Sequence, residues 1–289
     1  AGNDFALYDG EHLAHNNSRA WMVLMSKAGA LVPDNRDVEY IIGDVWINDT
    51  QVWDNRIIVL RGNLTINATG NLTLMGTQLR MDCPQNGTYH IEVLSNGTMF
   101  IFDQDWDNTT VADASVITSN TTDGKHRFLF WVRKDARFEM RNSELSWCGY
   151  SGSDSELFGL KIQTNNATID HCYLNNNWRG LFTWNSSAKI QYNKISGAAS
   201  SGSGIASFMG SPYFSNNELF NNPIGIKLST CYNVMFSTNY IHHNSNGLNI
   251  DDLTNITIAN NTFYHNDEDG IFIVQSSPLI INNSIIDNE

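Results

Sequence analysis

The sequence has few basic residues, few prolines and few cysteines. Its 289 residues include 17 Lys and Arg against 30 Asp and Glu, so the net charge is -13 and the pI is near 4.9. Nucleic acids and anionic membranes attract basic surfaces, and this balance argues against both as partners. A hydrophobic content of 41% is nevertheless ample for a buried core, which indicates a globular chain.

Long apolar runs are also missing. A membrane-spanning helix needs roughly 20 consecutive apolar residues, whereas the run at 21–25 has five. We therefore expect no membrane span, and no secretory signal is recognisable. Because the first residue is Ala rather than Met, we expect a processed or excised chain.

The cysteines follow no Cys-x-x-Cys or Cys/His spacing, which argues against a metal site built from them. Four cysteines allow three disulfide connectivities. Free buried thiols are an equal alternative, and the sequence leaves the choice open. The four positions are Cys83, Cys148, Cys172 and Cys231.

Asparagine is the abundant residue, since 37 Asn accompany 20 Thr and 25 Ser. Random placement would give roughly 6 Asn-x-Ser/Thr triplets, whereas the sequence has 14. The excess predicts N-glycosylation and an extracellular or cell-surface location. Alternatively, Asn-rich turns that lead into Thr-rich strands produce such triplets without any sugar. The predicted glycosylation sites are Asn16, Asn48, Asn63, Asn67, Asn71, Asn86, Asn96, Asn108, Asn120, Asn166, Asn185, Asn255, Asn260 and Asn282.

A repeat of about 22 residues runs through the second half of the sequence. Asn recurs two residues before an apolar side chain at 193, 217, 239, 261 and 283, and Gly recurs at 159, 180, 204, 225, 247 and 270. Each period holds two or three short alternating strands, and helical periodicity is absent from this half. The pattern predicts an all-β solenoid of parallel strands, in which the repeated Asn side chains stack and hydrogen-bond from rung to rung.

Two segments depart from this repeat. Residues 1–40 are predicted to form an N-terminal cap, with a short helix after Ser18 that covers the first rung. Residues 41–289 are predicted to form the β-helix, with a protruding loop at 103–127. The sequence stops in mid-pattern at NNSIIDNE, so we expect either a chain cut there or an open end that meets another chain.

The two ladders and the segment at 43–66, GDVWINDTQVWDNRIIVLRGNLTI, resemble the pectin-lyase-like superfamily of right-handed parallel β-helices. Within it, the sequence is most similar to the asparagine-rich β-helix repeat proteins of archaeal cell surfaces. The resemblance covers about 40–289 and implies a right-handed parallel β-helix of about ten rungs. Because this fold carries lyases, hydrolases, adhesins and structural proteins alike, the function has to be argued from sites.

The catalytic motifs of that superfamily are incomplete here. TIDHCYL at 168–174 resembles the WIDH motif of pectate lyases, but Thr168 replaces Trp and no proline lies in an RxPxxR segment. The polygalacturonase pattern is matched only by Asp251 and Asp252, and paired-carboxylate chemistry needs a second carboxyl group at a fixed distance. We therefore interpret Asp170 and His171 as rung residues and predict no catalytic residues and no enzyme activity.

One acidic segment has the spacing of a calcium loop. Asp103, Asp105 and Asp107 place oxygen ligands at positions one, three and five. The glycine and the closing Glu of such a loop are both replaced, so the calcium-loop pattern is incomplete. These three aspartates are the candidate calcium site, and the sequence predicts no other cofactor. The histidines, including His242 and His243, have no metal spacing and are expected on the surface.

The Gly ladder sets the orientation of its neighbours. The residue after each Gly is expected to point inward, so the next residue points outward. Phe182, Trp184, Phe208 and Phe272 then lie on one outer face. Contiguous outward aromatics indicate a protein partner, a glycan, or cover by a loop of the same chain such as 146–158.

These patterns predict a non-catalytic, glycosylated extracellular structural protein, a subunit of a cell-surface layer, sheath or filament. Its subunits are expected to form a homo-oligomer or filament through the solenoid ends, and to carry covalent N-glycans. The alternative is a carbohydrate-active β-helix enzyme, a lyase or a hydrolase, or a glycan-binding adhesin that contacts an acidic polysaccharide.

Overall fold

The computed structural model describes residues 36–105, 107, 113–152, 154–252 and 255–289. The helix predicted after Ser18 and the sequons at Asn16 and Asn108 lie outside these residues. Within the described ranges, no helix combines the length and the apolar character that a membrane span requires.

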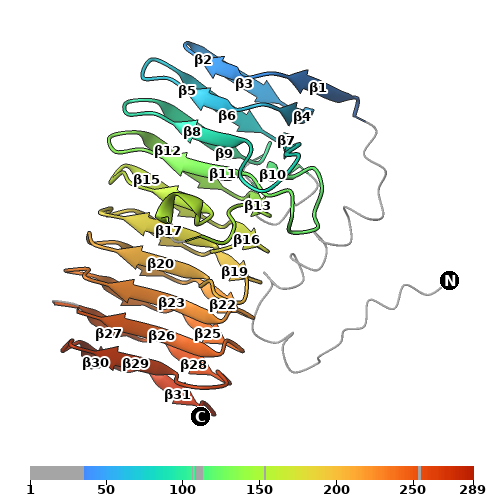
Figure 1. Cartoon of the computed structure of the whole chain (residues 1–289). Helices are drawn as coiled ribbons and strands as arrows, with labels where there is room; N and C mark the ends of the chain where they lie inside the picture. Colours follow the sequence, from blue (N-terminus) through green and yellow to red (C-terminus); the bar gives the residue numbers. More distant parts are fainter. Residues whose placement is uncertain (1–35, 106, 108–112, 153, 253–254) are drawn as a thin grey trace.

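In the described part of the chain, thirty-one short strands wind into a solenoid (Figure 1). Consecutive strands belong in turn to sheets A, B and C, so every third strand pairs in parallel with its predecessor. Sheets B and C have ten strands each and sheet A has eleven, which makes ten complete rungs. The predicted parallel β-solenoid of about ten rungs is confirmed.

The strands of the three sheets have the following bounds. Sheet A contains β1 (Val38–Ile42), β4 (Ile57–Arg61), β7 (Gln78–Met81), β10 (Val116–Ser119), β13 (Glu144–Ser146), β16 (Tyr173–Asn175), β19 (Lys194–Ser196), β22 (Glu218–Phe220), β25 (Tyr240–His242), β28 (Thr262–Tyr264) and β31 (Ser284–Ile286). Sheet B contains β2 (Val45–Ile47), β5 (Leu64–Ile66), β8 (His90–Val93), β11 (Leu129–Val132), β14 (Leu160–Ile162), β17 (Leu181–Trp184), β20 (Ile205–Phe208), β23 (Ile224–Ser229), β26 (Asn246–Asp251) and β29 (Ile271–Val274). Sheet C contains β3 (Thr50–Asp54), β6 (Asn71–Met75), β9 (Thr98–Phe102), β12 (Arg137–Arg141), β15 (Ala167–Asp170), β18 (Lys189–Gln191), β21 (Tyr213–Ser215), β24 (Met235–Ser237), β27 (Thr257–Ala259) and β30 (Leu279–Ile281).

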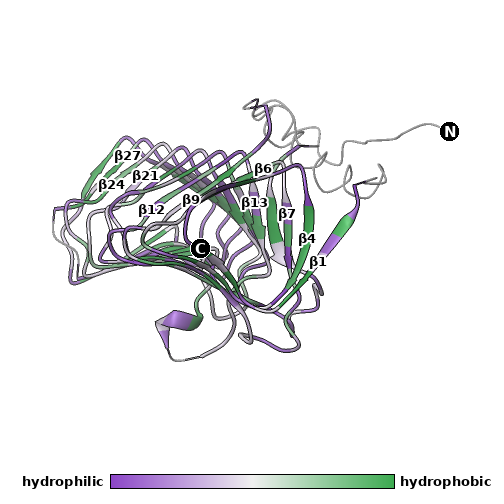
Figure 2. Ribbon diagram, turned by 90° about the horizontal axis from the view of Figure 1, so that it is seen from above, coloured by the Kyte–Doolittle hydropathy of each residue, from purple (hydrophilic) through white to green (hydrophobic). Residues whose placement is uncertain are grey.

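The rungs share one apolar interior. The residues that follow the ladder glycines lie in adjacent strands of sheet B and point inward, as predicted, and all are fully buried except Ile271 in the last rung, which is half-buried. Seen along the stack in Figure 2, successive rungs lie one behind another. Each rung therefore covers the apolar edge of the one before, and the core is continuous along the solenoid. The buried column consists of Leu160, Leu181, Ile205, Ile226 and Leu248.

The predicted asparagine ladder is confirmed in the turn from sheet C to sheet A. Each Asn donates through Nδ2 to Oδ1 of the Asn in the next rung, at 2.9–3.0 Å. The same Oδ1 accepts the backbone N–H of the preceding ladder Asn. Neighbouring rungs thus satisfy one another's buried amide groups. The ladder consists of Asn193, Asn217, Asn239, Asn261 and Asn283.

A second asparagine ladder, which we did not predict, lies in the turn from sheet A to sheet B. Asn222, Asn244, Asn266 and Asn288 are linked through Nδ2 and Oδ1 at 3.1, 3.0 and 2.7 Å. Their constant separation of 22 residues is visible in the sequence. Ladders on both sides of sheet A give its strands the same register in successive rungs.

We predicted that the segment 103–127 forms one protruding loop, and this prediction is wrong. Residues Val116–Ser119 form β10, which pairs with β7 and β13. Ile117 is fully buried and continues the core through this rung. This strand has only four residues and lies between polar stretches, so its sequence was too short to predict a strand there. At the other boundary, β1 begins at Val38, inside the segment predicted as a cap.

All four cysteines are free and buried, which confirms the free-thiol alternative. Burial raises the pKa of Cys83 to about 11 and that of Cys172 to about 12. Thiols of this kind stay protonated and act as small core side chains.

Candidate functional site

Aromatic side chains lie next to one another on the outer face of sheet B. Trp184 and Phe208 are register partners in β17 and β20, and their ring centroids are 4.7 Å apart. Phe182 precedes Trp184 by two residues, and these two rings are 6.0 Å apart. Because Leu181 is fully buried, strand alternation turns Phe182 and Trp184 away from the core.

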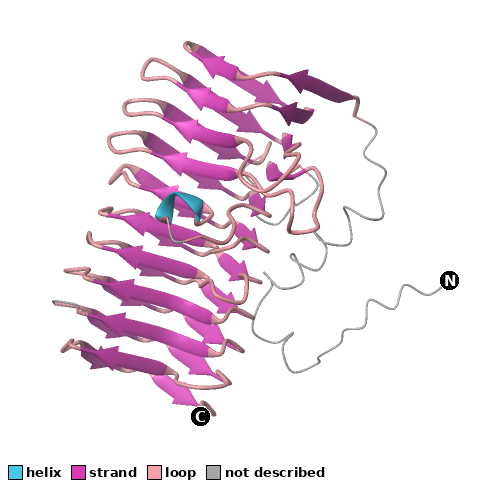
Figure 3. Ribbon diagram, in the orientation of Figure 1, coloured by secondary structure: helices cyan, strands magenta, loops and turns pink. Residues whose placement is uncertain are grey.

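The chain itself covers part of this face. The segment 149–158 folds back beside sheet B and contains the single helical turn η1 (Ser155–Leu157), drawn in cyan in Figure 3. Phe158 packs edge-on against Phe182 at 5.6 Å, and Phe182 is only 5% exposed. Phe182 is therefore not an exposed contact residue, which corrects that prediction, and the alternative of cover by a loop such as 146–158 is confirmed for this ring.

A glycine makes this return of the chain possible. Gly149 has a φ of +74°, and a Cβ atom there would lie 2.0 Å from the backbone nitrogen of Gly159. The next residue, Tyr150, donates its backbone N–H to the carbonyl oxygen of Leu157 at 2.9 Å. A side chain at position 149 would therefore open the loop that covers Phe182.

Lys161 joins the covering loop to the aromatic residues. Its side chain is buried, its Nζ donates to Ser155 Oγ at 3.0 Å, and it forms an ion pair with Glu156. The same Nζ lies 5.9 Å and 5.4 Å from the ring centroids of Phe182 and Trp184. These distances allow a cation–π attraction to both rings.

Arg133 extends this network toward the first rungs. Its Nε lies 2.5 Å from Glu92 Oε1, its Nη1 lies 2.8 Å from Glu156 Oε2, and its guanidinium carbon is 4.7 Å from the ring centroid of Trp131. His90 stacks on the same tryptophan at 4.7 Å. Burial alone would raise the pKa of Glu156, but hydrogen bonds from its two cationic partners outweigh burial and lower it. The carboxylates of the network are therefore held in ion pairs.

A shallow pocket of about 180 Å³ lies at the other end of the same face. Lys227, Asn249, Asp251, Phe272 and Val274 line it, and Phe272 is 46% exposed. Asn249 Oδ1 is buried without a hydrogen-bond partner in the described part of the chain. Small-molecule sites usually enclose ~300–1,000 Å³, so this depression suits contact with a ligand lying over it.

We use the term aromatic strip for Trp131, Trp184, Phe208 and Phe272, the accessible or half-buried rings on the outer face of sheet B. The strip runs from β11 to β29, which at ~4.8 Å per strand is roughly 29 Å. Trp131 was missed because it lies outside the regular Gly ladder. Its signal was the short, wholly apolar stretch FLFWV at 128–132, which is rich in aromatic residues.

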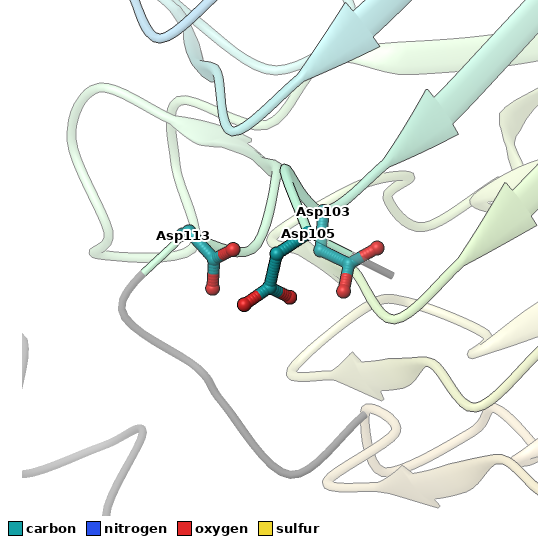
Figure 4. Close-up of side chains that lie close together, drawn as sticks. All are labelled: Asp103, Asp105 and Asp113. Carbon is teal, nitrogen blue, oxygen red and sulfur yellow. The ribbon is translucent and has the colours of Figure 1, made fainter. Parts of the chain in front are cut away.

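Three aspartates converge at the insertion after β9 (Figure 4). Each of Asp103, Asp105 and Asp113 offers a carboxylate oxygen, and these oxygens lie within 4.8 Å of one another. Asp107 does not belong to this group, which corrects its predicted place as the third member. Its backbone N–H donates to Asp105 Oδ1 at 2.8 Å, and the chain returns to the cluster at Asp113.

The two residues of the incomplete lyase motif lie away from the aromatic strip. Asp170 ends β15 in sheet C, and its Oδ1 is 2.8 Å from His171 Nδ1. The imidazole of His171 stacks on Tyr192 at 4.7 Å, and Arg141 Nη1 lies 3.6 Å from Asp170 Oδ2. These contacts join neighbouring rungs.

A buried charged cluster on the outer face of sheet A was not predicted. Glu218 Oε2 lies 2.9 Å from Lys194 Nζ, and its Oε1 lies 3.2 Å from His242 Nε2. His242 is 1% exposed, so its predicted surface position is wrong. The three residues are 24 positions apart in sequence, and only the register of adjacent rungs brings them together.

The twelve sequons in the described residues are not spread evenly. Six lie in the turns that lead from a strand of sheet B to the next strand of sheet C, and a seventh, Asn71, is the first residue of β6 beside such a turn, so all seven lie along one edge of the solenoid. Asn63 and Asn86, at another turn, are half-buried, and their Nδ2 atoms donate to Asp44 Oδ1 and to the Gly124 carbonyl oxygen. The seven edge positions are Asn48, Asn67, Asn71, Asn96, Asn166, Asn185 and Asn255.

Comparison with known proteins identifies the fold. A family model described as a right-handed beta helix region matches residues 185–289. Among solved structures, a double mutant of the periplasmic alginate epimerase AlgG aligns with a TM-score of 0.58 at 15% identity, covering 80% of this chain. The chain is a right-handed parallel β-helix. A single mutant of the same epimerase aligns with a TM-score of 0.50 over 92% of the β-helix chain, also at 15% identity.

The similarity extends to the fold and no further. The β-helix chain spans 57% of the first epimerase structure and 66% of the second. No curated protein sequence matches it. What this β-helix binds must therefore be argued from the aromatic strip and from the charged groups around it.

Proposed function

We propose that this β-helix is a non-catalytic, N-glycosylated extracellular scaffold that holds a polysaccharide along the aromatic strip. The observation that carries the proposal is the row of rings on the outer face of sheet B, in which the ring centroids of Trp184 and Phe208 are 4.7 Å apart. Flat rings in a row offer apolar surface to successive sugar rings of a polymer. A structural neighbour, the alginate epimerase, is by its name a protein that acts on a polysaccharide.

Charge favours a neutral polymer. Two cations beside the strip, Arg133 and Lys161, already face the carboxylates of Glu92 and Glu156. A third, Lys227, lines the pocket at Phe272 together with Asp251. The chain as a whole carries -13, which repels a polyanion. A neutral polysaccharide requires no new ion pairs and loses nothing to this repulsion.

The same ion pairs favour binding over catalysis. A general acid or base works best with a pKa near the pH of the reaction. The pKa of Glu156 is lowered by its cationic partners, so this carboxylate is a poor proton donor at neutral pH. We therefore propose that a bound polymer leaves unchanged.

An extracellular location is supported by the edge that carries seven sequons. Asn96, Asn166 and Asn185 are exposed there. Glycans on this edge would flank the aromatic strip without covering it, because the strip lies on the strands of sheet B and the sequons lie at their ends.

Affinity electrophoresis in gels that contain a neutral glucan or alginate tests the proposal. We expect the neutral glucan to retard the protein and alginate to leave it unaffected. Trp184→Ala should weaken retardation roughly tenfold, whereas Tyr40→Ala, which removes an exposed ring from sheet A, should not. Retardation that persists in Trp184→Ala would remove the strip from the proposal, and release of shorter sugars would contradict the non-catalytic role.

A structural role as a self-assembling subunit is the second candidate, and the last rung favours it. Ile273, Ile280 and Ile285 continue the core columns of β26, β27 and β28, yet they are 38%, 43% and 51% exposed. A further rung of the same kind would cover them, and in this candidate function a second copy supplies that cover. Light scattering should then show association that increases with concentration and that Ile280→Asp abolishes. A monomer at every concentration would sink this candidate.

A further inference from the structure

The insertion after β9 has a closed neck on the wall of the solenoid. Ser115 Oγ donates to the carbonyl oxygen of Phe102 at 2.6 Å and accepts the Thr77 backbone N–H at 3.1 Å. The Gly76 backbone N–H donates to the same Phe102 oxygen at 3.2 Å. The chain therefore leaves and returns at one point. This closure brings Asp113 next to the two aspartates that follow Phe102.

A buried carboxylate oxygen at this neck is unsatisfied. Asp103 is fully buried, and its Oδ2 accepts one hydrogen bond, from Asn142 Nδ2 at 3.1 Å. Its Oδ1 is buried and has no hydrogen-bond partner among the described residues. Burial, together with the charges of Asp113 and Asp105, raises the pKa of Asp103. A buried carboxylate that has one unsatisfied oxygen and two like charges beside it is costly unless a cation joins the group.

We propose that Asp103, Asp105 and Asp113 bind one calcium ion at the neck of this insertion. All three offer hard oxygen ligands, which calcium and magnesium prefer. The oxygens lie within 4.8 Å of one another, close enough to bind one ion together. Calcium accepts irregular arrangements of oxygen ligands, whereas magnesium demands near-ideal octahedral geometry and keeps several of its waters, so this unevenly spaced set favours calcium. Water and backbone oxygens complete the six to eight ligands that calcium takes.

The site differs from the one that sequence spacing suggests. A loop with ligands at positions one, three and five would use Asp107, whereas the closed neck replaces it with Asp113, ten residues after Asp103. The ion would clamp the two ends of the insertion to each other. Asp103 would anchor it to the rung through Asn142.

Calorimetric titration of the chelator-treated chain with calcium chloride tests the proposal. We expect one binding site in the wild type, and a loss of roughly tenfold or more in affinity for Asp103→Asn and for Asp113→Asn. Asp107→Asn is the matched control, because it removes the same charge from the same segment, and its affinity should stay within about twofold of the wild type. Absence of binding at millimolar calcium overturns the site, and so does an equal loss in Asp107→Asn and Asp113→Asn.

Thermal unfolding separates a lost site from a lost fold. In chelator, the Tm of Asp103→Asn should equal or exceed that of the wild type, because the substitution removes a buried charge that has no ion to balance it. Calcium chloride should raise the Tm of the wild type and not that of Asp103→Asn, and magnesium chloride should raise the wild-type value less. A wild-type Tm that is the same in calcium and in chelator overturns the proposal.

Discussion

Lys194 Nζ lies 2.9 Å from Glu218 Oε2, and both side chains are buried on the outer face of sheet A. Burial opposes ionisation of the Glu218 carboxyl group. The hydrogen bond from His242 and the charge of Lys194 prevail, and the pKa of Glu218 falls from 4.5 to about 2. The negative charge is therefore part of the folded state at every pH above that value.

We expect this pair to make stability depend on acid. A carboxyl group with a lowered pKa in the folded chain stabilises the fold above its unfolded pKa, here 4.5, and this contribution is lost as the pH falls toward about 2. The free energy of unfolding of the wild type should thus decline over this window more steeply than that of Glu218→Gln. Urea denaturation at several acidic pH values measures both slopes. Glu268→Gln, which removes an exposed carboxyl group, is the matched control, and equal slopes for Glu218→Gln and the wild type would refute the prediction.

The middle of the asparagine ladder is expected to be intolerant of change. Asn239 Nδ2 donates to Asn261 Oδ1 and to the Phe214 carbonyl oxygen, while its Oδ1 accepts from Asn217. Asn239→Leu leaves these buried groups unsatisfied, at a cost of about 1–3 kcal/mol for each. Chemical denaturation should show a loss of at least ~3 kcal/mol in the free energy of unfolding. A loss below about 1 kcal/mol would mean that water replaces the amide.

A substitution at the residue before Asn239 is expected to stabilise the fold. Thr238 has a φ of +55°, an unfavourable conformation for a β-branched residue, whereas three equivalent positions in other rungs hold Asn216, Asn260 and Asn282 and a fourth holds Tyr192. Thr238→Asn should raise the free energy of unfolding by about 1 kcal/mol. The reciprocal substitution Asn216→Thr should lower it by a similar amount. If neither variant changes the midpoint of denaturation, backbone strain at this turn is negligible.

The sequence predicted what repeats. Leu160 and its partners in neighbouring rungs recur at nearly constant spacing, so each rung reinforces the assignment of the others, and the inward column and the first Asn ladder were both found. The same reasoning should have found Asn222 and its ladder. This second ladder was not predicted, because the residues that precede its asparagines in the turns from sheet A to sheet B differ from rung to rung.

The sequence could not predict contacts made by unrepeated segments. Phe158 covers Phe182 only because the segment 149–158 folds back over sheet B. The repeat of about 22 residues contains no signal that predicts this fold-back. Asp113 joins Asp103 because hydrogen bonds at Phe102 close the insertion, whereas spacing alone pointed to Asp107. Contacts between charged residues of adjacent rungs likewise cannot be predicted before the register of the strands is known.

Glycan occupancy should follow the exposure of each sequon. An attached glycan needs the Asn side chain at the surface, and Asn96, Asn166 and Asn185 are exposed, whereas Asn71 is half-buried with Oδ1 in the interior. Mass spectrometry of peptides from the natively produced protein should find glycans at exposed sequons such as these three, and little or none at Asn71.

Two variants make this measurement decisive. Asn185→Gln should lower the mass of the intact protein by one glycan. Asn216→Gln, which changes an exposed turn Asn outside any sequon, should leave the glycan mass unchanged. An intact mass equal to that of the sequence without glycans would support the other interpretation of the triplets, in which Asn is present because it favours turns and Thr because it favours strands. Thr168 and Thr257 do lie in strands directly after such turns, so occupancy, and not the count of sequons, separates a glycoprotein from an Asn-rich solenoid.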